Sequence, residues 1–227
     1  MTAHVDQAEQ EARGIGDTEH RPHIEDLLYR LDRNPEHFMV DTERDELKEA
    51  GRLMSQESEA YEYSFSMFLP ADFPIVPVRL VIAQWKQNCP DRRPCDDDSP
   101  VLAVRYVSKV LSITKNIGGK QTVLYEEKSE FRNRWLDFKF QARFSPSETG
   151  RVKAWLGDKQ LVDYQGVTGN AENAATGYPS PSYFYFKMGL YRDLMAEPMT
   201  IYIDEYRKRQ LGQGVFSSPA APARNPT

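Results

Sequence analysis

Residues 183–192 (YFYFKMGLYR) hold a lysine and a tyrosine that could take part in proton transfer. In an extended strand Lys187 and Tyr191 share one face, roughly 13 Å apart at about 3.3 Å per residue. Gly189 lies between them and allows a bulge that would bring them closer. Because a neighbouring cation stabilises a phenolate, the tyrosine could then act as a general base. The alternative is a stacked aromatic strand without chemistry.

Two further segments carry polar groups suited to an anionic ligand. In residues 81–86 (VIAQWK), Gln84 and Lys86 share one face of a predicted strand, where an amide beside a cation suits a substrate carboxylate. In residues 42–48 (TERDELK), Arg44 and Glu46 share a face, so the acid can orient the guanidinium toward a ligand. The alternatives are a strand end that meets water for the first segment and a surface ion pair for the second.

Overall composition narrows the classes of function. The chain has 227 residues with 29 Lys+Arg and 34 Asp+Glu, and its net charge of -5 argues against non-specific nucleic-acid binding. Hydrophobic residues make up 40% and aromatic residues 11%, which is enough for a folded core. No apolar run approaches the length of a transmembrane helix, and the N-terminus lacks the pattern of a signal peptide.

Period-two alternation of hydrophobic residues predicts strands through most of residues 35–210. In residues 135–144 (WLDFKFQARF), the residues expected to face one way are Leu136, Phe138, Phe140, Ala142 and Phe144. Similar runs occur at 61–69, 78–86, 101–107, 110–114, 122–126, 151–156 and 199–206, separated by turn-forming segments. Nine or more short strands indicate an all-β fold, a β-sandwich or jelly roll.

The ends of the chain differ in composition from this domain. Residues 1–34 are predicted to form an acidic arm with a short helix around 24–31. Residues 211–227 form a predicted flexible Pro/Ser/Ala tail.

The polar faces of the predicted strands are rich in Lys, Arg, Gln and Tyr. Tyrosine rings stack on sugars, and cations pair with carboxylates, so a curved sheet lined in this way suits an anionic polymer. The candidate substrate-binding residues are Glu46, Arg105, Lys139, Arg143, Tyr183 and Tyr185.

The two cysteines, Cys89 and Cys95, have five residues between them. We expect a disulfide that closes this loop and therefore an oxidising compartment, with two free thiols as the alternative. The spacing is a poor zinc signal. The run Asp96-Asp97-Asp98 lacks the alternate spacing of a calcium loop, so a solvated loop is favoured over a structural calcium site, and we predict no metal site.

Taken in order, these motifs resemble the heparin lyase I-like polysaccharide lyases, with jelly-roll glucuronan lyases and alginate lyases as more distant relatives. The resemblance covers roughly residues 42–206 and is carried by R-x-E-L at 44–47, YSFSMFLPADFP at 63–74, VIAQWK and YFYFKMGLYR. It implies a concanavalin-like β-jelly-roll sandwich with a concave substrate groove. It also implies β-elimination of uronic-acid polysaccharides without an organic cofactor.

The resemblance assigns the family's catalytic tyrosine to Tyr191 and its lysine to Lys187. It assigns the carboxylate-binding glutamine to Gln84 and the arginine to Arg44. Lys86 stands where the family usually has histidine, and no histidine follows His37, which argues against an imidazole base.

Elimination removes the C5 proton of a uronate, whose carboxylate opposes the developing negative charge. Gln84, Arg44 and Lys86 would neutralise that carboxylate, and Tyr191 would take the C5 proton and protonate the leaving O4. One group can do both when proton and leaving oxygen lie on the same side of the ring, as in glucuronate and mannuronate.

The sequence therefore predicts a secreted or periplasmic polysaccharide lyase that is monomeric and acts on a glucuronan-like polymer. It predicts an anionic polysaccharide as partner, and neither nucleic acid nor membrane. One alternative is a non-catalytic carbohydrate-binding jelly roll or an inactivated lyase. A glycoside hydrolase would need two carboxylates across the scissile bond, and Asp204 and Glu205 are expected to point to opposite faces.

Overall fold

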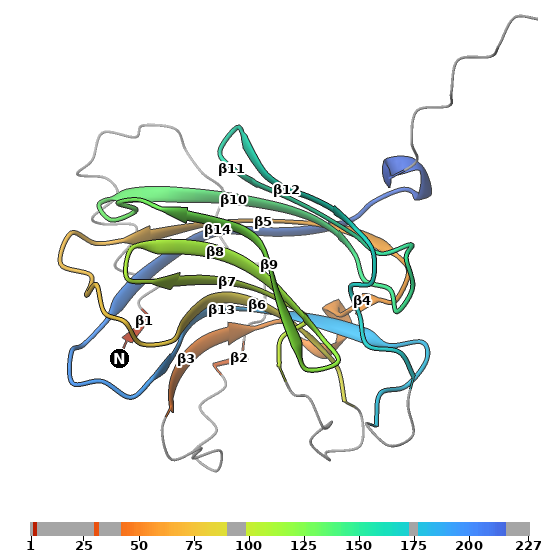
Figure 1. The fold of residues 1–227 in the computed structure, drawn as a ribbon, viewed down its shortest axis with the longest axis horizontal. Coiled ribbons are helices and arrows are strands. Elements are labelled where there is room, and N and C mark those ends of the chain that lie inside the picture. Colours follow the sequence, from red (N-terminus) through yellow and green to blue (C-terminus); the bar gives the residue numbers. More distant parts are fainter. Residues whose placement is uncertain (1, 4–29, 32–41, 90–98, 173–176, 217–227) are drawn as a thin grey trace, which may run out of the picture.

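The computed structural model describes residues 2–3, 30–31, 42–89, 99–172 and 177–216. Two β-sheets are stacked face to face (Figure 1). Helical structure in the described residues is limited to two 3-10 turns, Gly51–Leu53 and Gln213–Phe216. None of the described helices is long and apolar enough to span a membrane.

The six-stranded sheet has the order β1 (Thr2–Ala3), β14 (Thr200–Gln210), β5 (Ala60–Leu69), β10 (Arg134–Arg143), β11 (Arg151–Leu156) and β12 (Lys159–Gln165). The eight-stranded sheet has the order β2 (Arg30–Leu31), β3 (Thr42–Lys48), β13 (Tyr183–Asp193), β6 (Leu80–Gln87), β7 (Leu102–Val107), β8 (Val110–Ile117) and β9 (Lys120–Lys128), and β4 (Ser55–Gln56) pairs with β13. All the pairings are antiparallel except that of β1 with β14. The predicted all-β sandwich of jelly-roll type is confirmed.

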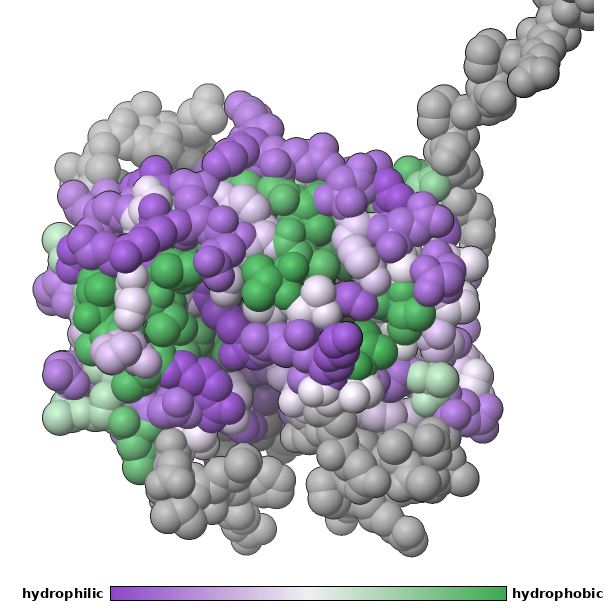
Figure 2. Space-filling model, in the orientation of Figure 1, coloured by the Kyte–Doolittle hydropathy of each residue, from purple (hydrophilic) through white to green (hydrophobic). Residues whose placement is uncertain are grey.

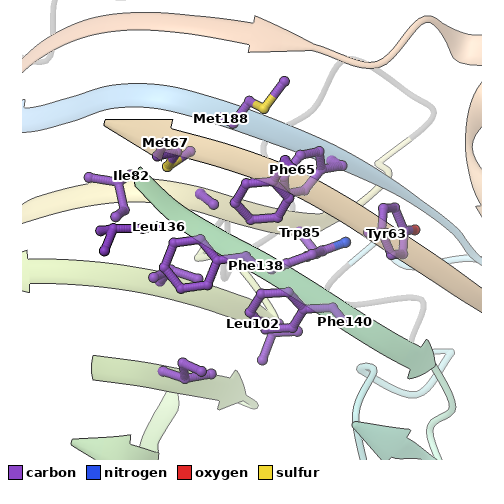
Figure 3. Close-up of a cluster of buried hydrophobic side chains, with 14 of the residues drawn as sticks. Tyr63, Phe65, Met67, Ile82, Trp85, Leu102, Leu136, Phe138, Phe140 and Met188 are labelled. Atoms are coloured by element: carbon purple, nitrogen blue, oxygen red, sulfur yellow. The ribbon is translucent and has the colours of Figure 1, made fainter. Parts of the chain in front are cut away.

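The core is formed by alternate residues of both sheets (Figure 3). The Trp85 ring of β6 lies 4.7 Å from the Phe186 ring of β13 and 4.6 Å from the Phe140 ring of β10, measured between centroids. Phe65 of β5 packs against Phe186 at 5.1 Å. Aromatic contacts that cross between the sheets add specific geometry to the hydrophobic burial that holds a sandwich together.

Glu49, directly after β3, links the two sheets through a buried ion pair. Its Oε1 lies 3.0 Å from Lys208 Nζ and accepts a hydrogen bond from the Tyr206 hydroxyl at 2.5 Å, and its Oε2 accepts one from the Phe186 backbone N–H at 2.9 Å. Burial raises the pKa of Glu49 and lowers the pKa of Lys208, while the attraction between the two groups opposes both shifts. Because Tyr206 and Lys208 belong to β14, these bonds tie the sheets together at this end.

Strand β12 and the two-residue strands β1, β2 and β4 were not among the expected strands. Val162 is the only buried residue of β12, so the alternation of this strand is weak.

The domain limits also differ from the expectation. Arg30–Leu31 pairs with β3 as strand β2, so the expected helix at 24–31 does not extend to its end, and residues 24–29 lie outside the described residues. Pairing of β1 and β2 brings residues before 35 into the sheets. The 3-10 turn Gln213–Phe216 lies within the segment expected to be a flexible tail.

The surface is mostly polar on the side drawn in Figure 2, where hydrophilic side chains surround smaller hydrophobic areas. The exposed large hydrophobic side chains of the described residues are Val123, Tyr183, Leu194 and Val215. Scattered apolar residues of this kind are normal for a folded domain.

Candidate active site

Most of the residues predicted to carry chemistry lie together on the outer face of the eight-stranded sheet. Tyr191 of β13 is opposite Arg44 of β3 on one side and Val81 of β6 on the other. Val81 is in turn opposite Arg105 of β7. These residues form one row across the four adjacent strands β3, β13, β6 and β7. In this row Tyr191 lies between Arg44 and Arg105, which are far apart in the sequence.

The predicted bulge at Gly189 is present. The register between β13 and β6 shifts between Met188 and Tyr191, and Gly189 has a φ of 135°, which non-glycine residues rarely adopt. A Cβ atom at this position would lie 2.3 Å from the backbone oxygen of Asp45. The glycine thus lets β3 approach β13 closely beside Tyr191.

A buried carboxylate organises the side chains next to Tyr191. Glu46 Oε1 accepts a hydrogen bond from Gln84 Nε2, and Glu46 Oε2 lies 3.4 Å from Lys187 Nζ. Glu46 and Gln84 are each 2% exposed, and Lys187 is 3% exposed. The same Oε2 lies 3.8 Å from Nε of Arg44, which is 30% exposed.

This arrangement decides between the two readings of Arg44 and Glu46. A surface ion pair would leave both groups in water, whereas Glu46 is buried and contacts three neighbours. A buried carboxylate requires such partners, since an unpaired charge is costly in the interior. Arg44 is the member of the group that reaches solvent, and Glu46 fixes its orientation.

Two guanidinium groups lie over the Tyr191 ring. Arg44 Cζ is 4.7 Å and Arg79 Cζ is 5.0 Å from the ring centroid, both within cation–π range. Arg79 is held by Asp193, whose Oδ1 lies 2.9 Å from Arg79 Nε and 2.7 Å from Arg79 Nη2. The tyrosine that the sequence selected is therefore surrounded by positive charge.

Arg79 was not among the predicted site residues, and no sequence signal points to it. Strict alternation from Gln84 would place residue 79 on the core side. However, Ile82 and Ala83 both enter the core, and the register between β6 and β7 shifts there. This bulge reverses the alternation, so Arg79 joins the face that carries Gln84.

Arg105, predicted as a substrate-binding residue, completes the cationic surroundings of Tyr191. Its Nε donates a hydrogen bond to Thr114 Oγ1 at 3.2 Å. Burial lowers the pKa of Arg105, repulsion from Arg79 lowers it further, and Tyr191 has the opposite effect. We refer to Arg44, Glu46, Arg79, Gln84, Arg105, Lys187 and Tyr191 as the Tyr191 cluster.

Lys86 and Tyr185 lie next to the Tyr191 cluster. They are opposite each other on β6 and β13, and both are 9% exposed. Lys48 Nζ lies 4.6 Å from the centroid of the Tyr185 ring. Tyr183, at the start of β13 and opposite Gln56, is 43% exposed.

Two predicted substrate-binding residues, Lys139 and Arg143, lie elsewhere, and the expectation of one shared groove is wrong for them. Both belong to β10 in the six-stranded sheet and face outward, because Phe138, Phe140 and Ala142 fill the core. Lys139 Nζ lies 4.6 Å from the Trp155 ring, and Arg143 Cζ lies 5.2 Å from the Phe216 ring. Alternation showed that these side chains face outward but not from which sheet.

The expectation for Asp204 and Glu205 is also corrected. Ile203 and Tyr206 both enter the core, so the two acids between them both turn outward at a β-bulge, where Glu205 has a φ of 53°. Glu205 helps to line a hollow of about 330 Å³ on the six-stranded sheet. This hollow is also lined by Ser64, Phe65, Ser66, Asp137, Phe138, Lys139, Gly157, Asp158 and Arg207, and it contains no residue of the Tyr191 cluster.

The disulfide and metal expectations depend on a loop that the structure does not describe. Cys89 follows β6, whereas Cys95 and Asp96, Asp97 and Asp98 lie outside the described residues. The disulfide therefore stays a prediction. The described part of the chain contains no group of three or more His, Cys, Asp or Glu residues that could hold a metal ion.

Three solved structures resemble the fold. The endo-β-1,4-glucuronan lyase from the fungus Trichoderma reesei has a TM-score of 0.53 and 19% sequence identity, and the match covers 74% of each chain. An alginate lyase from Pseudomonas aeruginosa has a TM-score of 0.46 and 16% identity over 74% of each chain. A polysaccharide lyase family 7 alginate lyase has a TM-score of 0.43 and 15% identity over 73% of this chain and 70% of that chain.

Sequence comparison gives the family. The chain matches no curated protein. The model of the polysaccharide lyase family, in contrast, matches residues 21–207, which include both sheets almost completely and every residue of the Tyr191 cluster. The chain therefore belongs to the polysaccharide lyase family and is a lyase that acts on polysaccharides.

Proposed function

We propose that this lyase cleaves a uronic-acid polysaccharide by β-elimination and that it prefers a glucuronan-like polymer. The observation that carries the proposal is the position of Tyr191 between Arg44 and Arg105, with Arg44 and Arg79 over its ring. A partly exposed phenol among cations suits a reaction in which a proton is taken from a carbon next to a carboxylate.

In this mechanism the Tyr191 phenolate removes the C5 proton of the uronate. The electron pair of the broken C5–H bond forms the C4=C5 double bond, and the C4–O4 bond breaks. The resulting phenol gives its proton to the leaving O4, which regenerates the phenolate. One residue completes both transfers only if H5 and O4 lie on the same side of the ring, and glucuronate meets this condition.

Arg44 neutralises the substrate carboxylate, because its guanidinium reaches solvent and lies over the Tyr191 ring. The side-chain amide of Gln84 has two N–H groups. One donates to Glu46, and the other donates to the substrate carboxylate. Lys187 acts through Glu46, because its ammonium is buried against that carboxylate. Lys86 lies two residues after Gln84 on β6 and adds a fixed positive charge.

The choice of glucuronate over other uronates rests on this chemistry. Iduronate, guluronate and galacturonate need a second proton carrier across the ring, and the chain has no histidine after His37 to supply it. The fold likeness to an enzyme that acts on glucuronan agrees with the choice.

The proposal also includes the narrower relation to heparin lyase I-like enzymes and the secreted or periplasmic location.

The test is to follow the absorbance of the unsaturated product on glucuronan, alginate, heparin and hyaluronan. The Tyr191→Phe variant removes the proposed proton carrier and keeps the ring, so turnover should be abolished while oligosaccharide affinity stays within about tenfold. Tyr202→Phe makes the same change on the outer face of the other sheet and should retain full activity. A Tyr191→Phe rate above a tenth of wild type would exclude Tyr191 as the base. Binding without turnover in the wild type would instead indicate a carbohydrate-binding module or an inactivated lyase.

A further inference from the structure

The Tyr191 cluster holds more cations than carboxylates. Its cations are Arg44, Arg79, Arg105 and Lys187, whereas the carboxylates paired with them in the described residues are Glu46 and Asp193. Two positive charges are left over. In the proposed mechanism the Tyr191 phenolate balances one and the carboxylate of the cleaved uronate, held by Arg44, balances the other. A second anionic group is therefore indicated by the surroundings of Arg105 and not by the total charge.

Arg105 is the cation whose charge lacks a partner in the described part of the chain. It is part-buried, its hydrogen bond goes to the uncharged Thr114 hydroxyl, and no described carboxylate lies within ion-pair distance. Arg79 repels it and adds to the effect of burial in lowering the pKa of Arg105. A bound anion would relieve both the repulsion and the burial of an unbalanced charge.

Arg44 and Arg105 lie on either side of the position of proton transfer. Arg44 is on β3 and Arg105 is on β7, on opposite sides of Tyr191 in the row across the sheet. Arg105 is two strands from Tyr191, which places the two backbones about 10 Å apart at roughly 4.8 Å per strand. Because Arg44 neutralises the carboxylate of the cleaved sugar from the other side of Tyr191, we assign an anion at Arg105 to a neighbouring sugar.

We propose that Arg79 and Arg105 form an anion subsite that binds the carboxylate of the uronate next to the one that is cleaved. The enzyme then requires consecutive uronates and discriminates against polymers in which glucuronate alternates with an uncharged sugar. This inference rests on the proposed function, since it assumes that Tyr191 marks the cleaved residue.

The test compares kcat/KM on glucuronan, where every sugar is glucuronate, with kcat/KM on hyaluronan, where glucuronate alternates with N-acetylglucosamine. The wild type should prefer glucuronan. Arg105→Gln should lower kcat/KM on glucuronan at least tenfold more than on hyaluronan, because the effect of Arg105 on Tyr191 is common to both polymers and the loss of the subsite is not. Each variant is compared with the wild type on the same polymer, so a difference in shape between the two polymers does not enter the fold-change. Lys159→Gln, which removes an exposed cation from β12, is the matched control and should change neither value.

Two outcomes would overturn the subsite. One is an equal loss on both polymers in Arg105→Gln, and the other is a wild type that cleaves both polymers equally well. Should Arg105→Gln fail to fold, Arg79→Gln at its 43% exposed position supplies the same comparison.

The failure of the proposed function looks different, because the wild type would then cleave no uronate polymer. The subsite is still tested by binding in that case. Affinities for glucuronate and hyaluronan hexasaccharides are measured with Tyr191→Phe and with Tyr191→Phe/Arg105→Gln. The added change should weaken only the binding of the glucuronate hexasaccharide, and equal weakening of both would refute the subsite.

Discussion

Glu46 offers a way to separate a structural role from a positioning role within the Tyr191 cluster. The change Glu46→Gln keeps the shape of the side chain and removes a charge that lies 3.4 Å from Lys187 Nζ. At an effective dielectric constant of about 20, this attraction is worth about 5 kcal/mol. Removal of one partner of a buried pair typically costs about 3–5 kcal/mol, because the other charge is left unpaired. We therefore expect Glu46→Gln to lower the free energy of unfolding by about 3–5 kcal/mol.

The double variant Glu46→Gln/Lys187→Met removes both buried charges and should recover about 1–3 kcal/mol of this loss. Urea unfolding followed by tryptophan fluorescence measures both values, because Trp85 is fully buried in the core. Asp163→Asn, which removes a half-exposed carboxylate paired with Arg151, is the control and should cost below about 1 kcal/mol.

The double variant should recover part of the lost stability but none of the lost activity. Glu46 also orients Arg44 and Gln84, so kcat should fall in both variants and should not recover in the double variant. The reasoning is refuted if Glu46→Gln is no less stable than the Asp163→Asn control. It is also refuted if the double variant regains kcat together with stability.

Two further predictions concern the strands around Tyr191. Gly189→Ala should destabilise the protein by at least about 1–3 kcal/mol, because φ is 135° and the new Cβ would meet the Asp45 oxygen at 2.3 Å; an unchanged melting temperature would contradict this. Lys86→His should lower the rate on glucuronan at pH 8 and move the remaining activity to lower pH, because imidazole with a pKa of about 6.5 is mostly uncharged at pH 8. A variant as fast as wild type at pH 8 would show that Lys86 acts as a base and not as a fixed charge.

The sequence alone determined most of the long strands of this protein and several residues of the candidate site. Alternation at period two located nine strands, because each strand packs one face against the core and the pattern is local. The inward set of residues 135–144 is buried as expected. Arg44, Gln84, Lys187 and Tyr191 were selected by residue type and spacing, and they do lie on one face of one sheet.

Tertiary structure decided which outward faces become one surface. Lys139 and Arg143 show the same local pattern as Lys187, yet they lie on the other sheet, because alternation gives the face of a strand and not its partners. Arg79 reached Tyr191 only through the bulge at residues 81–83, which reverses the alternation of β6. Strand pairing and bulges depend on contacts between residues far apart in the sequence, and no local pattern contains them.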